Sequence, residues 1–262
     1  MSPEVAGVIF DLDGTLTAPG AISFDQLRTR IGMPSSGSIL AWIAANARDS
    51  AEQAHMEALV WEEERLALDR MRLGGGFADL AATIQDRGAS LRTAICTRNN
   101  GEALEAFDAL LQRSGFPPST ELFQVQIARS HHSPHLDRRI ENKPSHEPVH
   151  EIIRCWDLTR VYAPIVAHEH DQPSHRELLF VGDDIDDCLS ARRAGVRSGW
   201  IRHGQPFSER PAEDRAEDPA EDQAEDAAED PAEHPEMTRT ADLRFSDLSE
   251  VATVLSRQLR SG

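Results

Sequence analysis

The sequence contains very little lysine, cysteine and tyrosine. Of its 27 basic residues only Lys143 is a lysine, and there are three cysteines and one tyrosine. Three scattered cysteines do not form a disulfide framework, and no Cys-x-x-Cys pair points to a structural zinc site. The apolar run of residues 5–10 is interrupted by Asp11, too early for a signal peptide or a membrane span. We therefore expect a cytoplasmic protein that does not bind membranes.

The excess of acidic side chains is concentrated in one segment. The formal net charge is −18, and residues 211–234, with eleven acidic residues and one arginine, carry −10 of it. This segment repeats a four-residue unit built on Ala-Glu-Asp and contains almost nothing that could enter a core. Such a composition predicts a disordered insertion. The acidic balance also argues against binding nucleic acid through a basic face.

The single lysine is itself informative. A chain that uses arginine for nearly every positive charge keeps lysine only by chance or where a compact ammonium is needed. Lys143 is therefore a candidate functional residue.

Apolar runs alternate with helical patterns along most of the chain. Strands are expected at residues 5–10, 91–96, 122–127, 178–181, 196–201 and 241–245, and helices at 77–88, 102–112, 148–156, 189–194 and 248–259. This alternation predicts an α/β fold, a parallel sheet covered by helices on both faces. Residues 23–73 have helical periodicity only and end at Gly74-Gly75-Gly76. We expect Trp42 and Trp61 in the core of this helical bundle.

Polar residues that can do chemistry follow several of these strands. They are Asp11, Asp13, Thr97, Asp183 and Asp187, joined by Lys143 from a loop. Because the carboxyl ends of parallel strands form one edge, these side chains are expected in one crevice. Carboxylates crowd together only when a cation neutralises them, and oxygen ligands with a phosphate favour Mg²⁺.

Two of these carboxylates suit covalent phosphoryl transfer. One aspartate could attack phosphorus, and the other, two residues later, could move the proton of the leaving oxygen and of water. A lysine and a hydroxyl would hold phosphate oxygens. The residues thus indicate Mg²⁺-dependent phosphoryl transfer.

Four motifs in order resemble those of the haloacid dehalogenase (HAD) superfamily. They are Asp-Leu-Asp-Gly-Thr-Leu at 11–16, Ile-Cys-Thr at 95–97, Lys-Pro at 143–144 and Val-Gly-Asp-Asp-Ile-Asp-Asp at 181–187. The resemblance implies a Rossmann-like, three-layer core domain of residues 1–17 and 77–262. It also implies a small all-helical cap of residues 18–76, inserted after the first strand, as in the phosphoglycolate-phosphatase-like branch.

The same resemblance implies a role for each matching residue. Asp11 would be the nucleophile and a metal ligand, and Asp13 the general acid and base, with its backbone carbonyl on the metal. Thr97 and the Arg98 amide would bind the phosphoryl group, and Lys143 would orient the nucleophile. Asp183 would complete the Mg²⁺ site, supported by Asp187 or Asp184.

Some alternatives stay open at this point. Asp187 could instead be an acid at the start of a helix, Thr97 a turn residue, and Asn99 and Asn100 caps of the next helix. Residues 130–142, which include His135, are expected to form a polar loop.

Asp13 favours a phosphatase acting on a small phosphorylated metabolite, because haloacid dehalogenases of this superfamily lack an aspartate there. The alternatives are a phosphomutase of the same superfamily, or a scaffold whose acidic repeat binds basic partners. Either a monomer or a homodimer is compatible with the sequence.

Overall fold

The computed structural model describes residues 5–34, 39–156, 175–202, 208–209 and 240–257. The acidic repeat, residues 211–234, lies outside these ranges, so its expected disorder stays a prediction. Within the described ranges, no helix combines the length and the apolar character that a membrane crossing needs.

The centre of the molecule is a seven-stranded sheet in the order β3-β2-β1-β6-β7-β9-β8. Six of its strands are parallel, and only the edge strand β8 runs antiparallel to its neighbour. The strands are β1 (Gly7–Phe10), β2 (Arg92–Cys96), β3 (Val125–Ile127), β6 (His175–Gly182), β7 (Val196–Ile201), β8 (Ser208–Glu209) and β9 (Leu243–Phe245). The expected parallel α/β sheet is therefore confirmed, with the first strand near its middle.

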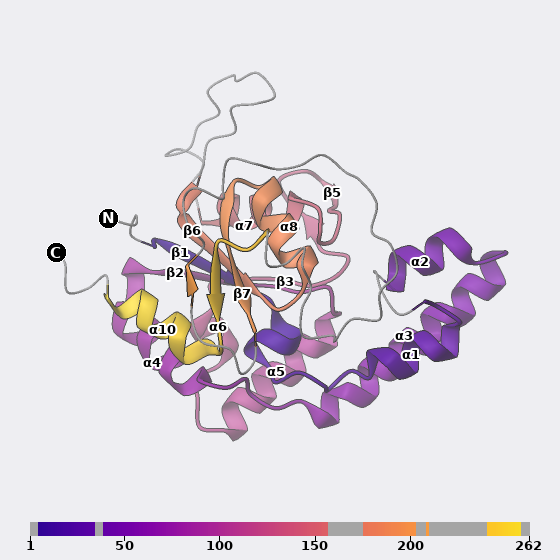
Figure 1. The fold of residues 1–262 in the computed structure, drawn as a ribbon, viewed down its shortest axis with the longest axis horizontal. Helices are drawn as coiled ribbons and strands as arrows, with labels where there is room; N and C mark the ends of the chain where they lie inside the picture. The colour runs from indigo at the N-terminus through magenta and orange to yellow at the C-terminus, as the bar shows by residue number, and fades with distance from the viewer. Residues whose placement is uncertain (1–4, 35–38, 157–174, 203–207, 210–239, 258–262) are drawn as a thin grey trace, which may run out of the picture.

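Helices cover both faces of this sheet, as Figure 1 shows. Val8 and Phe10 of β1 pack with α4, α5 and α10, while Ile9 between them packs with α7 and α8 on the other face. This division follows from the alternation of side chains along a strand. The covering helices are α4 (Phe77–Arg87), α5 (Gly101–Arg113), α7 (Glu147–Cys155), α8 (Ile185–Arg193) and α10 (Leu248–Arg257). The result is the three-layer arrangement predicted from the sequence.

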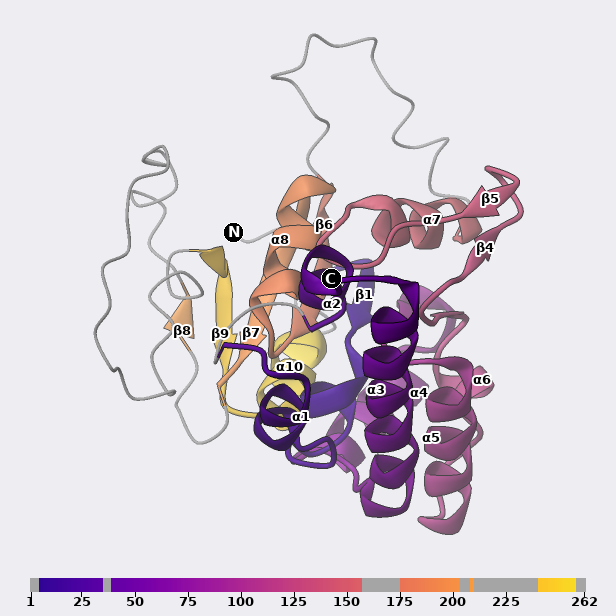
Figure 2. The same cartoon turned by 90° about the vertical axis from the view of Figure 1, so that its right-hand side faces the viewer.

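The segment between the first two strands is helical, as expected. It contains α1 (Phe24–Ile31), α2 (Ile39–Asn46) and α3 (Ser50–Arg70), which stand to one side of the sheet in Figure 1 and at the front in Figure 2. A small apolar cluster of its own holds these helices together, and its buried members are Leu27, Ile31, Met33, Ile43 and Val60. The chain enters and leaves side by side, through an antiparallel bridge between Thr17 and Leu73.

Of the two tryptophans expected in the core of the helical segment, one is exposed. Trp42 packs against the small cluster, but the prediction that Trp61 is a core residue is wrong, because 49% of its surface is exposed. The guanidinium of Arg129 lies 5.2 Å from the centre of its ring. The indole therefore packs beside a cation at the surface, an arrangement that apolar periodicity does not reveal.

Several short elements were not expected. They are the helical turns η1 (Leu12–Leu16) and η2 (Gly88–Ser90), helix α6 (Ser119–Leu122), and the hairpin of β4 (His132–Ser133) and β5 (Arg138–Arg139). The hairpin lies in the stretch 130–142, which the sequence predicted as loop. Helix α8 also begins at Ile185 rather than at 189, because the side chain of Asp184 caps its first turn.

Candidate active site

The first motif forms a tight turn at the carboxyl end of the central strand. The backbone N–H of Asp11 donates to the carbonyl oxygen of Val181 at 2.9 Å, which continues the pairing of β1 with β6. Gly14, inside η1, has a φ of +83°, a conformation that favours glycine. A Cβ at Gly14 would also collide with the Asp183 carboxylate. This glycine therefore lets the first motif approach the fourth.

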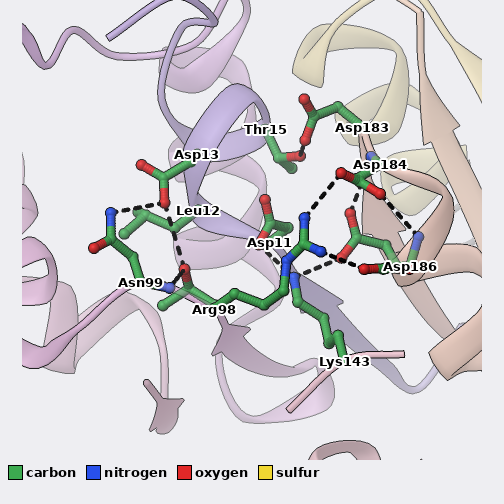
Figure 3. Close-up of polar contacts among 12 residues, drawn as sticks. Asp11, Leu12, Asp13, Thr15, Arg98, Asn99, Lys143, Asp183, Asp184 and Asp186 are labelled. Atoms are coloured by element: carbon green, nitrogen blue, oxygen red, sulfur yellow. Dashed lines mark hydrogen bonds and ion pairs between the residues drawn. The ribbon is translucent and has the colours of Figure 1, made fainter. Parts of the chain in front are cut away.

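Lys143 joins two of the predicted carboxylates, as Figure 3 shows in part. Its Nζ donates to Oδ1 of Asp11 and to Oδ1 of Asp187, each at 2.5 Å. The lysine side chain is only 2% exposed. Asp183 lies beside this pair and accepts a hydrogen bond from Oγ1 of Thr15 at 3.2 Å. We call Asp11, Lys143, Asp183 and Asp187 the lysine side of the site.

The lysine side is short of positive charge. Asp11, Asp183 and Asp187 each offer a carboxylate oxygen, and these atoms lie within 4.8 Å of one another. Burial raises the pKa of Asp11 although Lys143 opposes the shift, and burial with repulsion from Asp11 and Asp187 holds the pKa of Asp183 well above its ordinary value. Burial likewise raises the pKa of Asp187 to about 7, against the opposing effect of Lys143. One ammonium does not neutralise three crowded carboxylates, two of them buried and that of Asp183 partly buried, so this group of oxygen ligands fits a divalent cation.

Lys143 stays charged in this setting. Burial alone would lower its pKa, but the carboxylates of Asp11 and Asp187 hold that pKa above its ordinary value. The ammonium is thus a permanent partner of the two aspartates.

Asp187 is an acid of the first turn of α8, one of the two interpretations that the sequence left open, and it also contacts Lys143. Its Oδ2 accepts the backbone N–H of Asp184 at 3.1 Å and completes a capping box at the start of α8, while Oδ1 accepts from Lys143. Asp184 differs, because its carboxylate accepts from Arg98 at 2.8 Å. Although burial would raise the pKa of Asp184, this guanidinium holds it below its ordinary value. Of the two, only Asp187 contacts the lysine.

Asp13 has neutral partners. Its Oδ2 accepts from Nδ2 of Asn99 at 3.1 Å and from Oγ1 of Thr97 at 3.5 Å (Figure 3). Burial raises the pKa of Asp13, although the Asn99 hydrogen bond opposes this shift. We call Asp13, Thr97 and Asn99 the amide side. Of the described residues, those that bond to Asp13 through their side chains carry no charge.

The contact of Asn99 with Asp13 was not predicted from the sequence. Asn100 does cap α5, since its side chain accepts the backbone N–H of Ala103, but the prediction that Asn99 is a cap is wrong. The only signal was its place two residues after Thr97. Thr15 was noted only as part of the first motif, and Arg98 was expected to act through its backbone amide. The Arg98 side chain instead pairs with Asp184 and Asp186 and so links the loop after the second motif to the fourth motif.

A buried ion pair connects the helical insertion to the amide side. Glu64 of α3 accepts two hydrogen bonds from Arg129, at 2.7 and 2.8 Å, and one from Nδ2 of Asn100 at 3.1 Å. Arg129 follows β3, and its backbone N–H donates to the carbonyl of Asn99 at 2.8 Å. Helix α3 is therefore held next to the residues that contact Asp13.

The chain resembles known proteins in both sequence and fold. It is 26% identical to a haloacid dehalogenase-like hydrolase domain-containing protein of Arabidopsis thaliana, over 74% of this chain and 69% of the relative. It is also 26% identical to the phosphoglycolate phosphatase of Salmonella typhimurium, over 79% of this chain and 84% of the relative. The chain is homologous to the haloacid dehalogenase-like hydrolases. No protein-family model matches it.

The fold agrees with this homology. A crystal structure from Haemophilus somnus, described as a predicted phosphoglycolate phosphatase, matches with a TM-score of 0.56 at 15% identity. The match covers 95% of this chain and 97% of the other. The predicted HAD-like α/β fold is thus confirmed. The named sequence relatives confirm the prediction of a hydrolase of this superfamily.

Proposed function

We propose that the protein is a Mg²⁺-dependent phosphatase that hydrolyses a small phosphate monoester through an aspartyl-phosphate on Asp11. The observation that carries this proposal is the bridge of Lys143 between Asp11 and Asp187, beside Asp183. Its four residues come from three segments far apart in sequence. The homology to hydrolases, including one named phosphoglycolate phosphatase, supports the same reaction class.

The lysine side would hold the metal ion. Asp11, Asp183 and Asp187 would supply carboxylate oxygens for it, and the backbone carbonyl of Asp13 would be the further ligand implied by the HAD resemblance. When bound, Mg²⁺ would neutralise the crowded carboxylates and the oxygens of the phosphate.

In the first step, an oxygen of the Asp11 carboxylate attacks phosphorus, and the bond from phosphorus to the ester oxygen breaks. Lys143 holds the other oxygen of Asp11, which fixes the direction of the carboxylate. Asp13, whose pKa is raised by burial, gives its proton to the departing oxygen, so the alcohol leaves neutral.

In the second step, water attacks phosphorus and breaks the bond to Asp11. Asp13, now ionised, takes the proton from this water and returns to its starting state. Thr97 and the backbone amide of Arg98 would hold the phosphoryl oxygens during both steps, as the second motif implies. Asn99 keeps Asp13 in place through its amide.

We also propose that residues 18–76 form a cap domain over this site. Glu64 supports the assignment of a cap, because its hydrogen bonds with Arg129 and Asn100 join α3 to the core domain next to the amide side. Glu64→Gln should raise KM while kcat changes less. Glu62→Gln is the matched control, since exposed Glu62 pairs with Arg30 of the same helical segment. Equal effects of the two variants would contradict the cap assignment.

The reaction itself is tested with purified protein and a panel of phosphate monoesters. Phosphate should be released with Mg²⁺ and not after addition of EDTA, and 2-chloropropionate should release no chloride. Chloride release would overturn the assignment. Transfer of the phosphoryl group to a sugar phosphate in preference to water would favour the phosphomutase alternative.

A further inference from the structure

A second group of potential metal ligands shares no residue with the carboxylates of the active site. His135, Glu151 and Cys155 each offer one ligand atom, and these three atoms lie within 4.8 Å of one another. Glu151 and Cys155 are four residues apart in α7, so they share one face of the helix. His135 comes from the loop of the β4–β5 hairpin. The group thus joins two segments that flank Lys143 in the sequence.

The surroundings of Glu151 indicate that this group binds a ligand. Its side chain is 0% exposed, and among the described residues one oxygen accepts only a long hydrogen bond of 3.3 Å, from Arg154. The other, Oε1, is buried and has no hydrogen-bond partner among the described residues. Buried carboxylate oxygens normally have a donor or a cation beside them, so this one lacks the partner expected for it.

The hairpin that carries His135 is fixed in place without any metal. Oγ of buried Ser133 accepts the backbone N–H groups of His135 and Leu136, at 3.2 and 3.1 Å, which defines the loop. Buried Ile140 packs in the same core cluster as α7, and Arg138 pairs with Glu147 in the first turn of that helix. In Figure 2 the hairpin lies at one end of α7. The three ligand residues are therefore held in position by the contacts of the hairpin and α7, before any metal binds.

We propose that His135, Glu151 and Cys155 bind a divalent transition-metal ion of the Zn²⁺ class. Imidazole nitrogen, thiolate sulfur and carboxylate oxygen are ligands that zinc uses together, whereas Mg²⁺ selects oxygen ligands alone. One thiolate and one carboxylate neutralise the two charges of the ion. Binding releases the thiol proton to solvent, and three protein ligands leave a fourth position for water.

Such an ion would tie the hairpin to α7. Lys143 lies in the segment between them, so the metal would brace the chain that presents the lysine to Asp11. Arg154, bonded to the second oxygen of Glu151, orients that carboxylate. The role assigned to the ion is binding and bracing, and the binding can be tested without reference to the phosphatase reaction.

The test uses full-length protein stripped of metal, kept reduced, and titrated with Co²⁺ in excess Mg²⁺ that fills the aspartate site. A thiolate bound to Co²⁺ absorbs in the near ultraviolet, so the signal reports on cysteine ligation alone. We expect one equivalent of Co²⁺, displaced by Zn²⁺. Cys155→Ser should abolish the absorption, and His135→Ala and Glu151→Gln should each weaken binding by at least about tenfold.

The chain provides matched controls for this experiment. His132→Ala removes an exposed histidine of the same hairpin outside the ligand group, and should leave Co²⁺ affinity unchanged. Zn²⁺ should also slow alkylation of Cys155, the exposed cysteine, because Cys96 and Cys188 are buried. Absorption that persists in Cys155→Ser, or affinity equal in His135→Ala and His132→Ala, would overturn the proposal.

Discussion

The two carboxylates of the first motif are two residues apart and have opposite surroundings. Asp11, on the lysine side, is bonded to an ammonium and stands among other carboxylates, whereas Asp13, on the amide side, is held by a hydroxyl and a carboxamide. Burial raises the pKa of both, but within the described part of the chain only Asp11 has a cation in direct contact to oppose it. Neighbouring aspartates can therefore serve as nucleophile and as proton donor because their partners differ.

The largest effect is expected from the lysine side. Asp11→Asn removes the oxygen that would attack phosphorus, so kcat should fall by several orders of magnitude. The variant should stay folded, because an amide of similar size can still bond to Lys143. Phosphate release is measured together with thermal unfolding. Turnover close to that of the unchanged enzyme in a folded variant would show that Asp11 is not the nucleophile.

The amide side should respond in a way that depends on the substrate. Asp13→Asn cannot supply a proton, so hydrolysis of an alkyl phosphate should slow by about 10² to 10⁴-fold. A nitrophenyl phosphate, whose leaving group needs no proton, should be affected much less in its first step. Rates with both substrates give the contrast directly. An equal loss with the two esters would mean that Asp13 does not act as the acid.

The position of Lys143 should require a compact ammonium and not only a positive charge. The Lys143 ammonium is compact, and its side chain, only 2% exposed, contacts two carboxylates. Lys143→Arg keeps the charge but puts a planar guanidinium in the place of this ammonium. We expect kcat to fall by at least about tenfold, since the bulkier group would displace Asp11 or Asp187. Steady-state kinetics with a circular-dichroism control measure this. Full activity would show that this position needs charge alone.

These two sides differ in how far the sequence predicts them. The lysine side can be predicted from buried strands that end in aspartates. A parallel sheet brings the carboxyl ends of its strands to one edge, regardless of the conformation of the connecting loops. Asp11 and Asp183 were placed by that argument, and Lys143 stood out as the only lysine.

The amide side depends on contacts between loops, which no apolar pattern encodes. Whether Asn99 caps a helix or reaches Asp13 depends on how the turn after β2 meets the turn after β1. The exposed position of Trp61 and the hairpin around His135 were unpredicted for a similar reason. Polar pairings such as the contact of Arg129 with Trp61 decide them, rather than hydrophobic periodicity.

The smallest effect should come from Asn99, and it tests whether the amide side works as a unit. Asn99→Ala removes one neutral hydrogen bond from Asp13, of the kind that contributes about 0.5 to 1.5 kcal/mol, so kcat on an alkyl phosphate should fall by about two- to tenfold. Because Asn99 acts through Asp13, the nitrophenyl ester should be spared here too. A double-mutant cycle makes the test specific: in the Asp13→Asn background, Asn99→Ala should cost little more, since the proton donor is already gone. If the two losses multiply instead, Asn99 contributes to catalysis through some group other than Asp13, and the division of the site into two sides would have to be redrawn.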